Sequence, residues 1–206
     1  MTKSLRALFT LGLLLSAGFV ASNAAPALAA DDEMVENPKY KFWASFKPGA
    51  TATYTEVTKL GGPEKGGAPG GVEHKTITYR LQSVNKDKVV VLTTVVEEDF
   101  LSTIESAPTR ITFPAKVKKA HLVAFLNEWN AMDGKDEKIK IGDKEIVCKV
   151  KAGTHKVEGG SVEAKFCFSD AVPGGVVKHT RITRGGETVV AETVTTLVSF
   201  SETPKE

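Results

Sequence analysis

The sequence predicts a mainly β domain built on a single curved antiparallel sheet, similar in outline to half a barrel, with one short amphipathic helix packed on it. Apolar and polar residues alternate along most of the chain, which is the period of half-buried strands. Glycine-containing pairs separate these runs, where hairpins need tight turns. One segment instead has the spacing of an amphipathic helix. A two-sheet β-sandwich is the alternative architecture.

Residues 1–30 have the three parts of a cleavable secretory signal peptide. Lys3 and Arg6 precede an apolar run, and a stretch of small residues follows it. The motif Ala27-Leu28-Ala29 fits the rule for signal peptidase, which predicts cleavage after Ala29. The apolar run is shorter than the roughly 20 residues that span a membrane, so no membrane span is expected after cleavage. We therefore expect a periplasmic or extracellular protein.

Downstream of the leader, we expect a flexible acidic lead-in at residues 31–38 and one β-rich domain at residues 39–206. Neither cysteine lies near the cleavage site, so the mature chain is not predicted to be a bacterial lipoprotein. Of the 27 basic residues, two lie in the leader, and the other 25 balance the 25 acidic residues. A neutral chain is not expected to bind nucleic acid, because that affinity comes largely from clustered Lys and Arg.

The first half of the domain predicts three strands. Residues 40–46 and 73–82 each alternate, and Trp43 points away from the apolar face of the first run. Residues 89–96 are apolar on both faces and rich in β-branched side chains, as expected of a central strand. The residues that share a face are Tyr40, Phe42, Ala44 and Phe46 in the first run and Ile77, Tyr79 and Leu81 in the second.

The second half predicts a continuous antiparallel meander from Lys138 onward, with strands in residues 144–151, 161–169 and 188–200. Connections this short cannot join parallel strands. The predicted turns are Gly142-Asp143, Gly159-Gly160 and Gly185-Gly186, with Pro173-Gly174 at the centre of a type II turn. The residues that share a face are Ile146, Cys148 and Val150; then Val162, Ala164, Phe166 and Phe168; then Val190, Val194, Val198 and Phe200.

Residues 118–132 predict the helix. Apolar residues recur there at i, i+3, i+4 and i+7, which places them in one stripe. These residues are Leu122, Phe125, Leu126 and Trp129. Asp133-Gly134 supplies a stop. The glycine-rich segment 61–71 predicts a mobile loop, because it lacks the Gly-Lys-Ser/Thr ending of a phosphate-binding loop and leads into a strand.

The two cysteines, Cys148 and Cys167, leave a disulfide open. An oxidising compartment favours the bond. Alternation disfavours it, because Cys148 lies on the face of Ile146 and Val150, whereas Cys167 lies between two phenylalanines, on the other side of its strand. Side chains on opposite faces cannot be bridged. A bulge in either strand would reverse this expectation.

No motif in the chain predicts a catalytic, cofactor or metal site. The histidines form no HxxxH or HExxH pair, no CxxC occurs, and there is no GxSxG nucleophile elbow. A zinc site could be assembled only from Cys148, His155, Cys167 and His179, a set whose spacing matches no metal-binding rule. We therefore expect no catalytic residue, no cofactor and no metal.

The segment Ser-Asp-Ala-Val-Pro-Gly-Gly-Val-Val-Lys at 169–178 is the most distinctive string in the chain. With the strand that carries Cys148 and the strand after it, this segment resembles the C-terminal half of several uncharacterised exported bacterial proteins. The resemblance covers residues 136–200. It implies a curved antiparallel sheet, similar in outline to the periplasmic lipoprotein-carrier half-barrels, with an apolar concave face covered by helix and loop. It assigns no functional residue.

These observations favour an exported, non-catalytic envelope or periplasmic protein of unknown function that binds an apolar small molecule or an envelope protein inside the curve of its sheet. Two alternatives remain open. One is an extracytoplasmic hydrolase whose site carries no recognisable motif, and the other is a structural component of the envelope.

Overall fold

The computed structural model describes residues 33–61, 71–99, 102–119, 122 and 134–202. The chain divides into two compact units, Met1–Ala30 and Asp31–Glu206, and all of these residues belong to the second. The predicted signal peptide lies outside the described residues, and so does most of the glycine-rich segment. Most described residues lie in antiparallel strands, which confirms the prediction of a mainly β fold.

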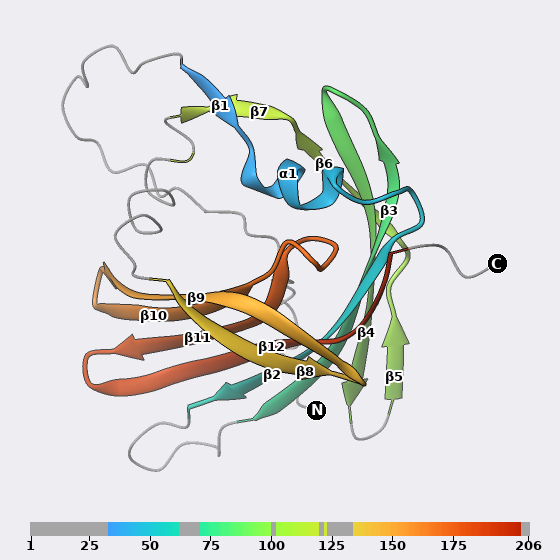
Figure 1. The fold of residues 1–206 in the computed structure, drawn as a ribbon. Coiled ribbons are helices and arrows are strands. Elements are labelled where there is room, and N and C mark those ends of the chain that lie inside the picture. The colour runs from blue at the N-terminus through green and yellow to red at the C-terminus, as the bar shows by residue number, and fades with distance from the viewer. Residues whose placement is uncertain (1–32, 62–70, 100–101, 120–121, 123–133, 203–206) are drawn as a thin grey trace, which may run out of the picture. The chain divides into compact units, whose positions relative to one another are not determined.

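Ten strands of the described chain form one antiparallel sheet in the order β5-β4-β3-β2-β12-β11-β10-β9-β8, with β6 also paired to β4 (Figure 1). The sheet consists of two meanders, joined where β2 pairs with β12. The first contains β2 (Thr51–Leu60), β3 (Val72–Val84), β4 (Lys88–Asp99), β5 (Ser102–Glu105) and β6 (Thr109–Pro114). The second contains β8 (Lys135–Ile141), β9 (Lys144–Val157), β10 (Gly160–Phe168), β11 (Val176–Gly185) and β12 (Thr188–Ser201). A single sheet agrees with the predicted architecture and not with the two-sheet sandwich.

The sheet is strongly curved but open. The edge strand β8 contacts β12 although three strands lie between them in the sheet. At the same place, the Nζ atom of Lys144 lies 4.7 Å from the centre of the Phe200 ring. The outer strands β5, β6 and β8 do not pair with one another in the described chain, so the sheet does not close into a barrel.

One apolar cluster connects the two meanders. It combines side chains from β2, β3, β4, β8, β9, β10, β11 and β12 with those of the short helix and of the loop before β11. Its buried members are Trp43, Ala50, Ala52, Tyr54, Leu81, Val89, Val91, Ile141, Ile146, Cys148, Cys167, Val172, Val177 and Leu197. Burial of this apolar surface is the main source of the stability of the curved sheet.

The helix α1 (Pro38–Ala44) replaces the strand predicted over residues 40–46, so that prediction is wrong. Asn37 caps the helix, because its side chain accepts a hydrogen bond from the Lys39 N–H at 3.1 Å, and Pro38 occupies the first turn. Tyr40, Trp43 and Ala44 pack on the core, and their spacing of i, i+3 and i+4 is helical. The segment therefore fits both the alternating pattern of a strand and the i, i+3, i+4 pattern of a helix, and the Asn37 cap with Pro38 favours the helix.

The described part of the predicted lead-in, residues 33–38, is also structured. It contains β1 (Met34–Glu36), which pairs with β7 (Lys116–Lys118), and the first residue of α1. The Nδ2 group of Asn37 donates a hydrogen bond to the Pro114 carbonyl at 2.8 Å. These contacts attach the start of the domain to the end of β6.

The amphipathic helix predicted over residues 118–132 lies almost entirely outside the described residues. Lys118, where the helix was predicted to begin, is instead the last residue of β7, whereas Lys119 and Leu122 are helical. The position of the apolar stripe relative to the sheet is therefore still a prediction.

The meander from β8 to β12 is confirmed, as is the turn at Gly142-Asp143. The next two turns are each displaced by one residue from the prediction and lie at Glu158-Gly159 and Gly186-Glu187. Gly160 and Gly185 belong to the strands instead and pair with each other.

The predicted apolar face of the last strand is wrong. Leu197 and Thr195 are buried, whereas Val190 and Val198 are exposed. The strand β12 shifts register against β2 after Leu197 and against β11 near Val190. Each bulge adds a residue on one strand and so reverses the alternation that a regular strand would keep.

The turn from Val172 to Gly175 packs against the side chains of α1. The Gly175 N–H donates to the Val172 carbonyl at 2.8 Å, and Gly174 has a φ of 80°, which confirms the type II turn. A Cβ on Gly174 would lie 2.9 Å from Cζ2 of Trp43. The absence of a side chain at this position therefore permits both the turn and the close approach of the helix.

We expect Gly174→Ala to destabilise the fold more than Gly142→Ala, measured by urea denaturation. Both glycines have positive φ, but a Cβ at Gly142 meets no atom within 4 Å. The control should lose about 1 kcal/mol from backbone strain alone. The Gly174 variant should lose about 2–4 kcal/mol, because the new methyl group also displaces Trp43. Equal losses in the two variants would contradict the packing of the helix on this turn.

Candidate functional site

The concave face changes from apolar to polar at one row of paired residues. Across three neighbouring pairs of strands, Thr195 lies opposite Glu56, Glu56 opposite Lys75, and Lys75 opposite Glu97. On the other side, Thr195 lies opposite His179. We call this row the polar belt, and its members are His179, Thr195, Glu56, Lys75 and Glu97. The adjacent row toward α1 is apolar or aromatic and consists of Leu197, Tyr54, Ile77 and Val95.

Glu56 is the most deeply buried charged member of the belt, with 7% of its surface exposed. Its Oε2 atom accepts a hydrogen bond from the Thr195 hydroxyl at 3.1 Å. Burial, together with the nearby carboxylate of Glu56, raises the pKa of Tyr79 to about 12. Burial, and to a lesser degree the neighbouring Tyr79, also raises the pKa of Tyr54. Both phenols therefore stay protonated at neutral pH beside a carboxylate.

Lys75 on β3 forms ion pairs with two carboxylates, Glu73 on the same strand and Glu97 on β4. Its Nζ atom lies 3.2 Å from Glu97 Oε1 and 3.9 Å from Glu73 Oε2, and its side chain is 12% exposed. A lysine this buried is retained only with charged partners, because removing one partner leaves a desolvated charge. The belt therefore consists of paired polar groups packed against the apolar core.

His179 ends the belt on β11 and stacks on Phe166 of β10, with ring centres 4.1 Å apart and an interplanar angle of 7°. Burial lowers the pKa of His179 to about 4, and the positive charge of Arg181 adds to the shift. The imidazole is therefore neutral at pH 7.

Beyond the belt, the long strands end in exposed apolar side chains. We call this group the apolar rim, and its members are Leu60, Val72, Val189 and Val190, which are 36% to 55% exposed. Leu60 lies opposite Ala191 and Val72 lies opposite Lys59, so Leu60 and Val72 lie at the same end of the sheet but point to opposite faces. The Gly61 N–H also donates to the Val190 carbonyl at 2.8 Å. The rim therefore spans the ends of β2, β3 and β12.

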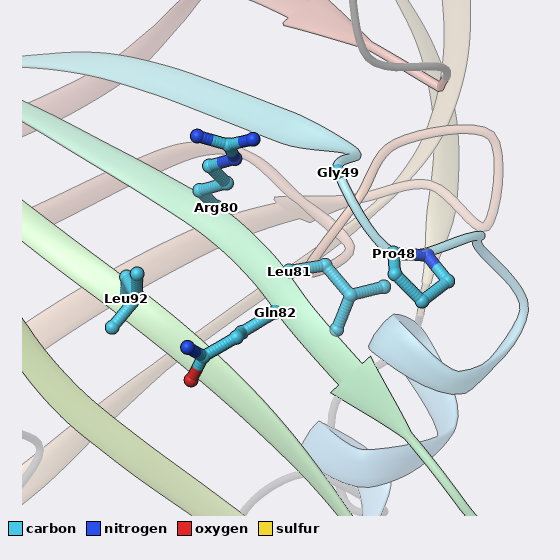
Figure 2. A pocket seen from close by; sticks show the side chains of 6 residues that line it. All are labelled: Pro48, Gly49, Arg80, Leu81, Gln82 and Leu92. Carbon is cyan, nitrogen blue, oxygen red and sulfur yellow. The ribbon is translucent and has the colours of Figure 1, made fainter.

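A separate open depression of about 420 Å³ lies at the bulge of β3, where Gln82 interrupts the pairing with β4 (Figure 2). Arg80 and Leu92 are paired residues on the face of β3 and β4 that is opposite to the buried Leu81. The depression therefore opens toward the outer face and not into the curve. Its lining residues are Pro48, Gly49, Arg80, Leu81, Gln82 and Leu92.

The two cysteines lie on the same face of the sheet, so the prediction that they point to opposite faces is wrong. Cys167 lies opposite Val150, two residues from Cys148. The error came from the phenylalanines of β10, which lie opposite lysines of β9 and not on the face of Val150. Both thiols are free and buried here. Burial is the main cause that raises the pKa of Cys148 to about 11, and it also raises the pKa of Cys167.

The residues considered for zinc do not come together. His155 and His179 lie on the face of the sheet that Phe166 occupies, whereas both cysteines lie on the other face. The described residues contain no group of three or more His, Cys, Asp or Glu side chains arranged to hold a metal ion. His121 lies outside the described residues.

Sequence reasoning missed the polar belt. Glu56 and Thr195 occupy core-facing positions, so alternation alone would assign apolar residues there. The belt becomes visible only when the register of five strands is known. The signal available in the sequence was a carboxylate two residues from Tyr54 within a regular strand, at a position that should be buried.

Among the described residues, no helix has the length and apolarity needed to cross a membrane. Comparison with models of known protein families, with curated proteins and with solved structures found no match.

We expect Thr93→Val and Thr195→Val to change stability in opposite directions, measured as the free energy of unfolding in urea. The buried Thr93 hydroxyl has no hydrogen-bond partner in the described chain, so its removal should stabilise the fold by about 1 kcal/mol. Loss of the Thr195 hydroxyl leaves buried Glu56 without its donor and should cost about 2 kcal/mol. Destabilisation by both variants would contradict the assigned hydrogen bonding.

We also expect acid to destabilise the domain through His179. Its pKa is about 4 in the fold and ordinarily 6.5, so the unfolded chain binds the extra proton between these values. The contribution is fully present above pH 6.5 and is lost as the pH falls to about 4, by up to about 3 kcal/mol. Urea denaturation at pH 7, 5.5 and 4.5 measures the loss.

The variant His179→Phe keeps an aromatic ring on Phe166 and should show a smaller loss of stability across this pH range. The control His74→Gln changes an exposed histidine and should retain the wild-type dependence. An unchanged dependence in His179→Phe would show that other groups cause the acid effect.

Proposed function

We propose that this chain is a non-catalytic protein of the periplasm or the extracellular space whose function is to bind another protein through the apolar rim. The observation that carries the proposal is the concentration of exposed Leu and Val side chains at one end of β2, β3 and β12. Exposed apolar side chains gathered at one end of a sheet beside polar ones are typical of protein interaction sites.

The packing of the concave face favours a protein partner over an apolar ligand inside the curve. Trp43, Val172 and Leu197 are almost fully buried there, so the chain's own side chains occupy the apolar part of that face. The polar belt then separates this core from the rim. The depression at the β3 bulge opens to the outer face and includes the exposed polar side chains of Arg80 and Gln82.

The state of His179 supports a non-catalytic role. A general base works best with a pKa near the working pH, whereas burial and Arg181 hold the pKa of His179 near 4. The other two described histidines, His74 and His155, are exposed and lie on different strands. The alternative of a hydrolase therefore gains no support from the described histidines.

The proposal can be tested with a photoreactive phenylalanine at Val190 or at Val72, with the protein expressed in the cells that produce it. Irradiation should yield a discrete adduct with a second polypeptide from both positions, identified on a denaturing gel and by mass spectrometry. The matched control is Val147 on β9, which is 55% exposed but lies outside the rim. It should yield no such adduct.

Val190→Asp should abolish the adduct at Val72 without lowering the midpoint of thermal unfolding, because Val190 is a half-exposed residue. A small-molecule adduct at the rim would favour the ligand version of the function instead. Equal labelling at Val147, or no adduct at either rim position, would refute the apolar rim as the binding site.

A further inference from the structure

Cys148 and Cys167 are diagonal neighbours in the β9–β10 hairpin. Cys167 lies directly opposite Val150, and Cys148 lies two residues further along the same face. Diagonal neighbours on one face of an antiparallel pair are the next nearest side chains after those directly opposite. Each thiol contributes to the shift in the pKa of the other, as expected of neighbouring side chains. The fold therefore brings the sulfurs together on one face.

The surroundings of the pair enclose it. Cys148 and Cys167 are 1% and 2% exposed. The Cys148 thiol donates to the Glu137 carbonyl of the edge strand β8 at 3.3 Å. Lys165 Nζ lies 3.4 Å from Glu137 Oε2, and Glu137 and Lys165 occupy positions on the cysteines' face of the sheet. This ion pair therefore connects β8 to β10 next to the thiols.

We propose that Cys148 and Cys167 form a disulfide across β9 and β10 in the native protein. The oxidant is the disulfide of a thiol–disulfide oxidoreductase or of a small disulfide such as oxidised glutathione, encountered in an oxidising compartment. The bond rests on the export part of the proposed function and not on the apolar rim.

The chemistry is an ordinary thiol–disulfide exchange. One cysteine thiolate attacks a sulfur of the oxidant, which forms a mixed disulfide and releases one oxidant thiolate. The second cysteine thiolate then attacks the cysteine sulfur of the mixed disulfide and releases the other oxidant thiolate. The two protons lost by the cysteines are taken up by the released thiolates. Two protein thiols are oxidised, and one external disulfide is reduced.

The burial of the two cysteines determines the stage of folding at which the disulfide forms. Only the thiolate attacks a disulfide, and burial raises the pKa of both thiols in the folded protein. An oxidant also cannot reach two sulfurs that are 1% and 2% exposed. Exchange therefore takes place before β8 docks on β9, and the folded hairpin then protects the bond from reductants.

The first test is refolding of the denatured, reduced protein in a glutathione redox buffer. We expect an intact mass lower by two hydrogens, no labelling by maleimide in denaturant, and a cross-linked peptide pair containing Cys148 and Cys167. Reduction of the oxidised protein should lower the midpoint of thermal unfolding by about 5–10 °C, because the bond constrains the unfolded chain.

The matched control is the double variant Cys148→Ala/Cys167→Ala, whose thermal midpoint should not respond to reductant. Each single variant should leave one thiol that maleimide labels in denaturant. The second test is the thiol state of protein purified under acid quench from the cells that produce it, where we expect the oxidised form.

Free thiols after refolding, or a bond only between two chains, would overturn the proposal. Thiols that oxidise on refolding but are reduced in protein taken from cells would also overturn it, and would count against export to an oxidising compartment. None of these three results bears on the apolar rim, because the cross-linked adducts there are measured independently of the redox state of the cysteines.

Discussion

The pairing of β2 with β12 is the constraint on which the rest of the structure depends. It joins the strands that come first and last in the sequence of the sheet, and their residues are more than a hundred positions apart along the chain. Each meander alone is a set of local hairpins with an unpaired edge. Only when the two meanders pair does the sheet have enough strands to curl and to enclose the apolar cluster. Loop-closure entropy opposes this pairing, so the shared core must compensate for it.

The curvature of the sheet is maintained by what packs inside it. The helix α1 places Trp43 against the turn at Gly174, and the loop before β11 contributes Val172 to the same cluster. At the other end, β8 contacts β12, and Lys144 at the start of β9 lies over Phe200. Bulges in β3, β11 and β12 accommodate the bend by changing the local twist. The same bulges determine which side chains face the core.

The interior is not uniformly apolar, and its polar groups are arranged by register. Thr195, Glu56 and Lys75 come from separate strands, yet each lies opposite the next. Buried polar groups are tolerated where they have partners, and this arrangement supplies them. The same register places Cys148 beside Cys167 and separates both from His179. Thus the register decides which chemistry is present on each face of the sheet.

The sequence by itself determined the fold class, the C-terminal meander and the type II turn at Pro173, because alternation and turn chemistry are local signals. Local signals failed where two of them overlapped, as at Trp43, where a helical cap outweighed an alternating pattern. They also failed where a bulge reversed the faces, as at Leu197, and where strand neighbours were needed, as for the two cysteines. The polar belt and the apolar rim were decided only by the tertiary structure. Each depends on which residue lies across from which, and the sequence of one strand does not contain that information.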